Sequence, residues 1–304
     1  MININDININ LSNKSEITFV IVSLEAIKGV ESCLKNIGND YQVIVVENSK
    51  NEKIKRKIEN NYKNAKCILL GKNFGYGYAA NKGISIVKTK FAFLINSDIE
   101  IVNSQVKEIE NEINKLNNKF SLLTPFYDDY LDFIKIKYDK FSKLYNKFDF
   151  KQNVQRVKII KGSSMLFNLS KFKGKIFDEN FFFFFEEIDV CKKIILKNEY
   201  IYLLNNIKIK HLGGEGVENI DKSEIDNFRN WHYYWSSFYY HKKYYGFYIS
   251  LLIYSKKLIK FFFLKNFYKF KDKTKYEVFK HRFNGLLSSI VGKKSATGPD
   301  YGGR

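Results

Sequence analysis

The segment ITFVIVS, at residues 17–23, is an almost unbroken run of β-branched and aromatic residues. Similar runs recur as YQVIVVE (41–47), KCILL (66–70) and FAFLIN (91–96). The stretches between them place apolar residues at helical spacing: Val30, Leu34 and Ile37, then Ile54 and Ile58, then Ile84 and Val87. Near-continuous apolar strands that alternate with helices are typical of a parallel sheet covered on both faces. The sequence therefore predicts an α/β fold with a Rossmann-like, mostly parallel sheet flanked by helices.

Length and composition indicate a large globular chain. Its 304 residues are 45% hydrophobic and 17% aromatic, which is enough apolar content to bury a sizeable core. The cysteines, Cys33, Cys67 and Cys191, are odd in number and far apart, which suits reduced thiols in a cytosol better than a disulfide framework. Residues 1–16 lack the basic start and apolar core of a signal peptide and read as a polar leader. We therefore expect a cytoplasmic protein.

The formal net charge of +19 raises the question of a nucleic-acid partner. Lysine is spread along the whole chain beside abundant Asn and Ile, which indicates a general composition bias and not one basic face. We therefore expect no nucleic-acid partner. A basic nucleic-acid-binding protein stays as an alternative, and it would show salt-dependent affinity for DNA or RNA. A general attraction to anionic lipids or phosphorylated ligands follows from either interpretation.

Polar or glycine-rich sequence follows each of the four predicted strands. Ligands of open α/β sheets bind beyond the carboxyl ends of the strands, so these positions are the first candidates for a binding site. In chain order they are Ser23 and Glu25, then Glu47 and Asn48, then the loop at 71–83, then Ser97, Asp98 and Glu100.

The loop GKNFGYGYAANKG, at residues 71–83, combines four glycines with Asn73 and Asn81. Glycines let a backbone approach a ligand closely and supply amides to a phosphate at a helix start. Gly75 opens a match to the dinucleotide fingerprint G-x-G-x-x-A, with Asp98 as the ribose-binding acid, and this alternative is an NAD-dependent oxidoreductase. However, that fingerprint normally sits in the first strand-to-helix turn, and this loop follows the third strand. The glycines also suit a tight turn that holds no ligand.

Asp98 and Glu100 follow the buried strand FAFLIN. Carboxylates at positions i and i+2 of an extended segment point the same way, so both could address one divalent cation. Mg²⁺ or Mn²⁺ held by one or two carboxylates and by ligand phosphates is the usual arrangement around a diphosphate leaving group. A short acid pair after a strand is more often a solvated turn, but the glycine-rich loop at the same sheet edge favours the metal site.

Four motifs, in this order, resemble those of the family 2 glycosyltransferases, in particular the rhamnosyltransferase-like branch that works on cell-surface polysaccharides. The loop NFGYGYAANKG (73–83) resembles N-x-G-[FY]-x-x-[AG]-x-N-x-G, and INSD (95–98) resembles LNPD. The segment FDENFFFFFEEIDVCKK (177–193) resembles FDExFFxYxEDxDLCxR, and HLGG (211–214) resembles the histidine and glycines that follow it. Together these motifs are specific, although each alone is weak.

This resemblance implies a GT-A fold, inverting chemistry and a divalent cation, Mg²⁺ or Mn²⁺. It implies a nucleotide-diphosphate sugar donor, with rhamnose or a similar sugar, and a saccharide or lipid-linked acceptor. Asp98 would hold the metal and the diphosphate, with Glu100 and His211 completing the site. The residues implied to bind the donor are Ser23, Glu25, Glu47, Asn48, Asn73, Gly75, Tyr76, Asn81 and Ser97. The chain departs from the family pattern at Ser97, where proline is usual, and at Glu47 and Glu187, where aspartate is usual.

Glu187 matches the catalytic base of the family. A carboxylate that removes the proton of an acceptor hydroxyl assists its attack on the anomeric carbon, and the phenylalanine run at 181–185 would raise the pKa of that carboxylate. Glu186 is expected to orient the base or the acceptor, and Asp189 to lie near a helix N-terminus as the third acid of the catalytic cluster. Several of the phenylalanines must instead pack in the core, because successive residues cannot all face one site.

The predicted organisation is a GT-A domain at residues 17–225, with a nucleotide-binding half at 17–102 and an acceptor half at 103–225. Residues 157–168, VKIIKGSSMLFN, read as a strand, a glycine turn and a second strand. By the resemblance, the acceptor contacts would be Gly162, Ser163 and Ser164. A variable acceptor loop is expected at 126–156.

Aromatic residues and lysines alternate from Trp231 onward. The longest uncharged run, residues 244–255, is well short of the roughly 20 residues that span a bilayer as a helix. Two interpretations of the helical segment at 226–292 stay open: it lies at an anionic membrane surface, at the inner face of the plasma membrane, or it is a helical hairpin that packs on the catalytic domain. Arg229 and His232 are expected near the rim of the site. The end, 293–304, reads as a flexible tail.

Overall fold

The computed structural model describes residues 15–127, 149, 151–212 and 222–298. Within these residues a nine-stranded sheet has the order β3-β2-β1-β4-β8-β6-β9-β5, with β7 paired to β9. The strands are β1 (Ile17–Ser23), β2 (Gln42–Glu47), β3 (Ala65–Leu69), β4 (Phe91–Asn96), β5 (Ile99–Glu100), β6 (Leu122–Tyr127), β7 (Val154–Val157), β8 (Ser164–Asn168) and β9 (Ile201–His211).

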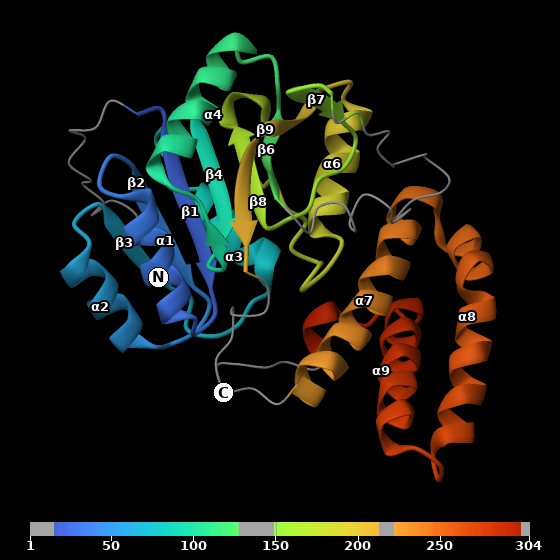
Figure 1. Cartoon of the computed structure of the whole chain (residues 1–304). Helices are drawn as coiled ribbons and strands as arrows, with labels where there is room; N and C mark the ends of the chain where they lie inside the picture. Colours follow the sequence, from blue (N-terminus) through green and yellow to red (C-terminus); the bar gives the residue numbers. More distant parts are fainter. Residues whose placement is uncertain (1–14, 128–148, 150, 213–221, 299–304) are drawn as a thin grey trace.

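The half of the sheet formed by β3, β2, β1 and β4 is parallel throughout. Its central strands are buried along nearly their whole length, because helices cover both faces of the sheet (Figure 1). The other half is mixed, since β8 runs antiparallel to both β4 and β6 whereas β9 runs parallel to β6. The α/β fold class predicted from the sequence is confirmed.

The helices occur between strands and in a C-terminal layer. They are α1 (Ile27–Ile37), α2 (Glu52–Asn61), α3 (Tyr76–Ile84), α4 (Asn103–Lys115), α6 (Glu186–Leu196), α7 (Lys222–Tyr245), α8 (Phe247–Tyr268) and α9 (Lys273–Ile290). Two short 3-10 turns, η2 (Leu169–Lys171) and η3 (Ser295–Thr297), complete the described elements. Figure 1 shows α7, α8 and α9 as a separate helical layer beside the sheet.

One strand prediction was wrong. The strand expected to begin at Val157 lies earlier, as β7, and residues 158–161 are irregular. Ile159 and Ile160 are nevertheless buried, so their apolar character reflects core packing and not strand pairing. This irregular segment carries Lys161 to the carboxyl edge of the sheet, where its Nζ lies 3.4 Å from Nδ1 of His211.

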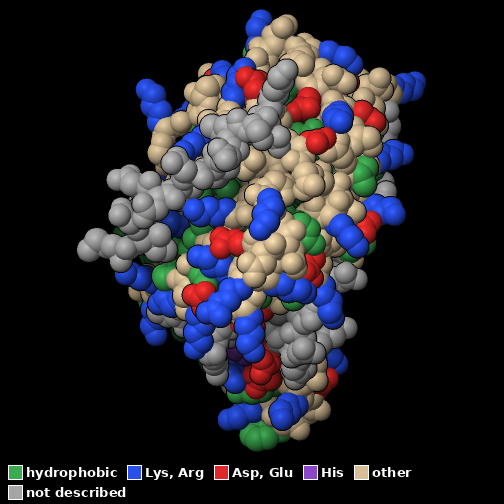
Figure 2. All heavy atoms as spheres, turned by 90° about the vertical axis from the view of Figure 1, so that its left-hand side faces the viewer, with side chains coloured by type: hydrophobic (Ala, Val, Ile, Leu, Met, Phe, Trp, Pro, Cys, Tyr) green, Lys and Arg blue, Asp and Glu red, His purple; other side chains and the backbone are tan. Residues whose placement is uncertain are grey.

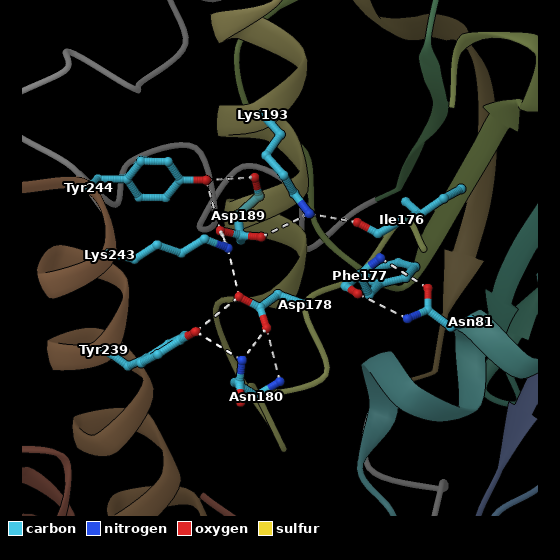
Figure 3. A network of polar contacts seen from close by, with 10 residues as sticks. All are labelled: Asn81, Ile176, Phe177, Asp178, Asn180, Asp189, Lys193, Tyr239, Lys243 and Tyr244. Carbon is cyan, nitrogen blue, oxygen red and sulfur yellow. Dashed lines mark hydrogen bonds and ion pairs between the residues drawn. The ribbon is translucent and has the colours of Figure 1, made fainter. Parts of the chain in front are cut away.

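A network of partly buried ion pairs and hydrogen bonds attaches α6 to α7 (Figure 3). Lys243 of α7 lies 2.7 Å from Asp189 of α6 and 2.7 Å from Asp178 of the preceding loop. The Tyr244 hydroxyl donates a hydrogen bond of 2.8 Å to Asp189, and Lys193 lies 3.2 Å from the second oxygen of that carboxylate. Aromatic contacts such as Phe181 against Tyr239 continue the interface. The helical layer is therefore fastened to the segment that carries the acid cluster.

The aromatic residues of α7 largely pack inward. Trp231, Trp235, Phe238 and Tyr240 are all buried, which fits the helical hairpin interpretation for this helix. Among the described helices, none combines the length and the apolar character needed to cross a membrane. Figure 2 shows Lys and Arg scattered over the face that it presents, with Asp and Glu among them.

Some predictions lie outside the described residues. These are most of the leader at 1–16, most of the acceptor loop at 126–156, the glycines of HLGG at 213 and 214, and the second half of the tail at 293–304.

Gly75 is required where α3 begins. Its φ is +88°, and a Cβ at this position would lie 2.4 Å from the carbonyl oxygen of Phe182. We expect Gly75→Ala to lower the free energy of unfolding by clearly more than the roughly 1–2 kcal/mol cost of a left-handed backbone alone. The reason is that the backbone segments at residues 75 and 182 must also move apart. Gly71→Ala is the matched control, since its φ is +85° and nothing lies within 4 Å of its Cβ position. Urea unfolding of both variants measures the difference, and equal destabilisation would contradict the packing argument.

Candidate active site

A cavity lies at the carboxyl ends of β1, β2 and β4, where the sequence predicted a site. Its wall includes polar groups from each strand end, the start of α3, and aromatic rings from the phenylalanine run and α7. The lining residues are Val22, Ser23, Leu24, Asn48, Asn73, Gly75, Tyr76, Asn96, Ser97, Asp98, Phe182, Phe183 and Phe228. Six of the nine residues expected to bind the donor, and Asp98 of the expected metal site, therefore share one cavity.

Asn48 fixes the shape of the glycine loop from the end of β2. Its side-chain amide donates to Oδ1 of Asn73 at 2.8 Å, and its own Oδ1 accepts from the backbone amide of Phe74 at 2.9 Å. Asn73 Oδ1 also accepts from the amide of Gly75 at 3.0 Å. These bonds hold the loop in the extended form that opens α3 beside the cavity. The backbone amide of Tyr76 then donates to the carbonyl of Phe182 at 3.0 Å, which joins the loop to the phenylalanine run.

Glu25 and Glu47 do not line the cavity, since Glu25 is exposed and Glu47 is buried beneath the strand end. Glu47 is completely buried, and its Oε1 accepts a 2.9 Å hydrogen bond from the backbone amide of Glu25. Glu25 itself has a φ of +55°, a backbone conformation that residues other than glycine and asparagine rarely adopt. The second carboxylate oxygen of Glu47 has no hydrogen-bond partner among the described residues.

Asp98 and His211 meet at the edge of the cavity. The carboxylate of Asp98 lies 3.4 Å from Nε2 of His211, and its Oδ1 is buried without a hydrogen-bond partner among the described residues. A carboxylate and an imidazole suit Mn²⁺ as protein ligands, and ligand phosphates and water would supply the other positions. Glu100 lies apart from this pair, because its carboxylate faces Lys210 on β9 at 3.8 Å. In the described part of the chain, no three His, Cys, Asp or Glu side chains gather as a metal site.

Glu186 and Glu187 stand at the start of α6, after a strained turn. Phe184 and Phe185 have φ of +67° and +71°, and Phe185 is the N-cap of the helix. Two successive non-glycine residues in the left-handed region are costly, and such strain clusters at functional sites. The turn directs both carboxylates into an apolar environment at a helix N-terminus, so their protonation differs from that of ordinary glutamates.

Burial raises the pKa of Glu187 to about 7, although backbone amides at the helix start and the charge of Lys161 act in the opposite direction. Burial raises the pKa of Glu186 well above its ordinary value, and the adjacent charge of Glu187 raises it further. The two carboxyl groups therefore bind protons more readily than ordinary glutamates do, and they titrate as a pair. A carboxylate with a pKa near 7 is well suited to general-base chemistry.

Tyr76 lines the cavity and also lies near the carboxylates of Glu186 and Glu187. Its hydroxyl donates a 3.0 Å hydrogen bond to the carbonyl of Gly162, and the Cβ position of Gly162 would lie 3.3 Å from Cβ of Glu187. Burial raises the pKa of Tyr76 well above its ordinary value, and the negative charges of Glu186, Glu187 and Asp98 raise it further. The phenol therefore stays protonated between the metal-site carboxylate and the candidate base.

The other expected acceptor contacts flank this position. Ser163 donates a 3.2 Å hydrogen bond to the Tyr127 hydroxyl, and its carbonyl accepts from the amide of Asn96. Ser164 is the first residue of β8 and is fully buried. Of the three, Gly162 has the most direct relation to Glu187.

Asn81 and Asp189 lie away from the cavity. The side chain of Asn81 bonds both backbone groups of Phe177, with distances of 2.9 and 3.0 Å (Figure 3). Asp189 faces the ion-pair network with α7 described above. Residues 187 and 189 are about 200° apart around a helix, so they face opposite sides of α6. Asn81 fastens the loop before α6 to α3, and Asp189 fastens α6 to α7.

Four residues near the site were not singled out from the sequence as contacts. Asn96 is the last residue of β4. Tyr127, the last residue of β6, contacts the ring of His211, and Lys161 approaches His211 from the irregular segment before β8. Phe228 reaches the cavity from α7, where it packs on Phe183 and on His232. His232 also stacks on Phe182 and is fully buried, so it lies behind the aromatic wall. A single phenylalanine in an aromatic helix gives no sequence signal of this role.

Comparison with known proteins agrees with this fold. Residues 24–174 match the model of the family described as glycosyl transferase family 2. The fold is similar to that of the mannosyltransferase PcManGT of Pyrobaculum calidifontis, solved in complex with GDP-Man and Mn²⁺, with a TM-score of 0.54 and 11% identity over 92% of this chain and 88% of that one. TarS 1-349 of S. aureus in complex with UDP aligns over 92% of each chain, with a TM-score of 0.49 and 12% identity. No curated protein matches the sequence. The GT-A fold that the resemblance implied is confirmed.

Proposed function

We propose that this chain, with a glycosyl transferase family 2 domain over residues 24–174, is an inverting glycosyltransferase that uses a nucleotide-diphosphate sugar. The observation that carries the proposal is the cavity at the carboxyl ends of β1, β2 and β4, which combines polar strand ends, the glycine loop and a partly unsatisfied carboxylate, Asp98. A carboxylate pair with raised pKa lies beyond Tyr76 on the far side. The residues proposed to bind the donor are thus separate from the carboxylates proposed to activate the acceptor.

The donor is proposed to lie with its nucleoside against the ends of β1 and β2 and its diphosphate against the glycine loop and Asp98. The amides of Phe74, Gly75 and Tyr76 already bond protein acceptors, so the start of α3 would favour phosphate oxygens through its helix dipole. Asp98 and His211 are the residues that would hold a divalent cation, Mg²⁺ or Mn²⁺, whose charge offsets that of the departing diphosphate. Lys161, close to His211, adds positive charge at the same edge.

Glu187 is proposed as the general base. It removes the proton from an acceptor hydroxyl, and the oxygen attacks the anomeric carbon on the face opposite the diphosphate, which inverts the configuration. Glu186, beside it in sequence, is proposed to orient Glu187 or the acceptor. Phe182 and Phe183 exclude water from the cavity, so that hydrolysis of the donor does not compete.

The finer assignment is a rhamnosyltransferase-like enzyme that acts on a saccharide or lipid-linked acceptor of a cell-surface polysaccharide. It is supported by the four motifs in order, including the long phenylalanine segment at 177–193. The apolar rings of the cavity suit the less polar face of a deoxysugar.

A panel of nucleotide sugars tests the proposal directly. With the full chain, a true donor in hundredfold excess over its dissociation constant should stabilise the protein by about 2.7 kcal/mol, and the thermal midpoint should rise only when Mn²⁺ or Mg²⁺ is present. Nicotinamide dinucleotides form the control arm. Strong stabilisation by NAD without metal, and none by any nucleotide sugar, would overturn the proposal in favour of an oxidoreductase.

A further inference from the structure

The outward face of α8 exposes a stripe of large apolar side chains. Phe270 is 90% exposed, Leu252 76% and Phe263 66%. With a separation of three, four or seven residues between neighbours, the stripe follows one side of the helix and the turn after it: Tyr248, Leu252, Ile259, Phe263, Phe267 and Phe270. Ser250, Tyr254 and Phe261 form the opposite, buried side. The helix is therefore apolar on both sides, although only one side has a partner among the described residues.

An exposed apolar stripe of this length is unusual on a protein surface and indicates an interaction site. Figure 1 shows α8 on the outer side of the helical layer, where it is accessible. The aromatic residues of α7 are buried, and packing on the catalytic domain accounts for them. That packing does not cover the exposed face of α8. A partner outside the described chain is therefore needed for the α8 face.

The charge around the stripe identifies the kind of partner. No Asp or Glu occurs from Asn227 to Lys271, whereas this stretch contains eight lysines. Lys256 and Lys260 lie exposed on the α8 face itself, and Lys269 and Lys271 flank Phe270 at its end. Exposed aromatic rings beside lysines fit the boundary between anionic lipid headgroups and acyl chains, and Asp272, the next acid along the chain, pairs with Lys275 at 3.2 Å. A second copy of the same face fits poorly, because it would bring lysine against lysine.

We propose that the α8 face docks on an anionic membrane surface, with α8 lying in the plane of the interface. Leu252, Ile259, Phe263 and Phe270 enter the acyl boundary, and the lysines contact the headgroups. This docking is independent of the proposed reaction, since none of these residues lines the donor cavity. Its consequence for an enzyme with a lipid-linked acceptor is that enzyme and acceptor share one surface.

Co-sedimentation of the full chain with vesicles tests the docking. Vesicles of phosphatidylcholine mixed with phosphatidylglycerol should pellet the protein at low salt, and pure phosphatidylcholine vesicles or high salt should release most of it. The double variant Leu252→Glu/Phe263→Glu should bind at least about tenfold more weakly, because two apolar anchors are lost. Lys256→Glu/Lys260→Glu should also weaken binding, and more at low salt than at high salt.

Matched control variants distinguish binding through the α8 face from attraction by the general positive charge of the chain. Leu196→Glu places the same acid on a 62% exposed leucine of α6, and Lys53→Glu/Lys119→Glu makes the same charge change on the catalytic domain. Both should bind nearly as the wild type does, and circular dichroism should show all variants folded. The proposal is overturned if the wild type ignores anionic vesicles, if the controls lose binding equally, or if a wild-type dimer that the α8 variants abolish shows a second copy on this face.

Discussion

Glu187→Gln is expected to lower the turnover of sugar transfer by about 10² to 10⁴, the usual contribution of a general base. The amide is nearly isosteric with the carboxylate but cannot take the acceptor proton. Donor affinity should survive, because Glu187 lies beyond Tyr76 and does not line the donor cavity. Steady-state kinetics with donor and acceptor, beside donor titration, measures the two effects separately. Turnover near that of the wild type would move the base role to Glu186.

Two further variants control for position and reach. Asp189→Asn makes the same neutralising change on the opposite side of α6, where the carboxylate pairs with Lys243 at 2.7 Å. It should lower the free energy of unfolding while leaving most of the turnover of the folded protein. Glu187→Asp keeps the base but shortens its reach by one methylene, so it should retain activity above that of the glutamine variant.

The pH profile offers an independent measurement. Because burial raises the pKa of Glu187 to about 7, the carboxylate is half protonated at that pH. Only the deprotonated form can act as the base, so wild-type turnover should rise with pH up to about 7 and level off above it. The Glu187→Gln variant should lack this rise. A wild-type rate that stays constant from pH 5 to 7, roughly the range below this pKa, would contradict the assignment.

Asp98→Ala is expected to abolish metal-dependent binding of the nucleoside diphosphate and to lower turnover by about 10² or more, since a bound cation supplies several kcal/mol of charge stabilisation. The reason is that Asp98 is the buried carboxylate at the cavity edge, with one oxygen that has no protein partner among the described residues. Binding of the nucleoside diphosphate with and without Mn²⁺, followed by calorimetry, gives a readout that does not depend on turnover.

Glu100→Ala is the matched control, because it removes a carboxylate two residues away that faces Lys210. It should keep most of the Mn²⁺-dependent affinity. Equal losses in both variants would return Glu100 to the metal site that the sequence pattern suggested. Unchanged Mn²⁺-dependent affinity in Asp98→Ala would exclude Asp98 as a ligand.

The parallel half of the fold could be read from the sequence because its signal is local. The strands β1, β2 and β4 are buried on both faces, so a continuous apolar run such as FAFLIN identifies each of them, and polar residues mark the edge where it ends. The rest of the sheet depends on distant pairing. Ile159 and Ile160 of the irregular segment at 158–161 are apolar because they enter the core, and periodicity cannot distinguish that from a strand.

The same limit applies to the site. Ser23, Asn48 and Asp98 could be predicted because strand ends of a parallel sheet meet at one edge. Phe228 could not, because its approach depends on how α7 docks, and Lys161 reaches His211 only through the irregular segment. Helix phase separates Asp189 from Glu187, which a list of neighbouring acids does not reveal.

The two sides of α6 have a consequence for protein engineering. One side carries Glu187, the proposed base, and the opposite side clamps α7 through Asp189 and Lys243. The C-terminal layer is consequently not an exchangeable module. A chimaera that grafts helices from another chain after residue 212 would leave the Asp189 carboxylate without Lys243 and the phenylalanine run without Tyr239 and Phe228. Such a graft should change the acceptor side of the enzyme unless α6 and its clamp are transplanted together.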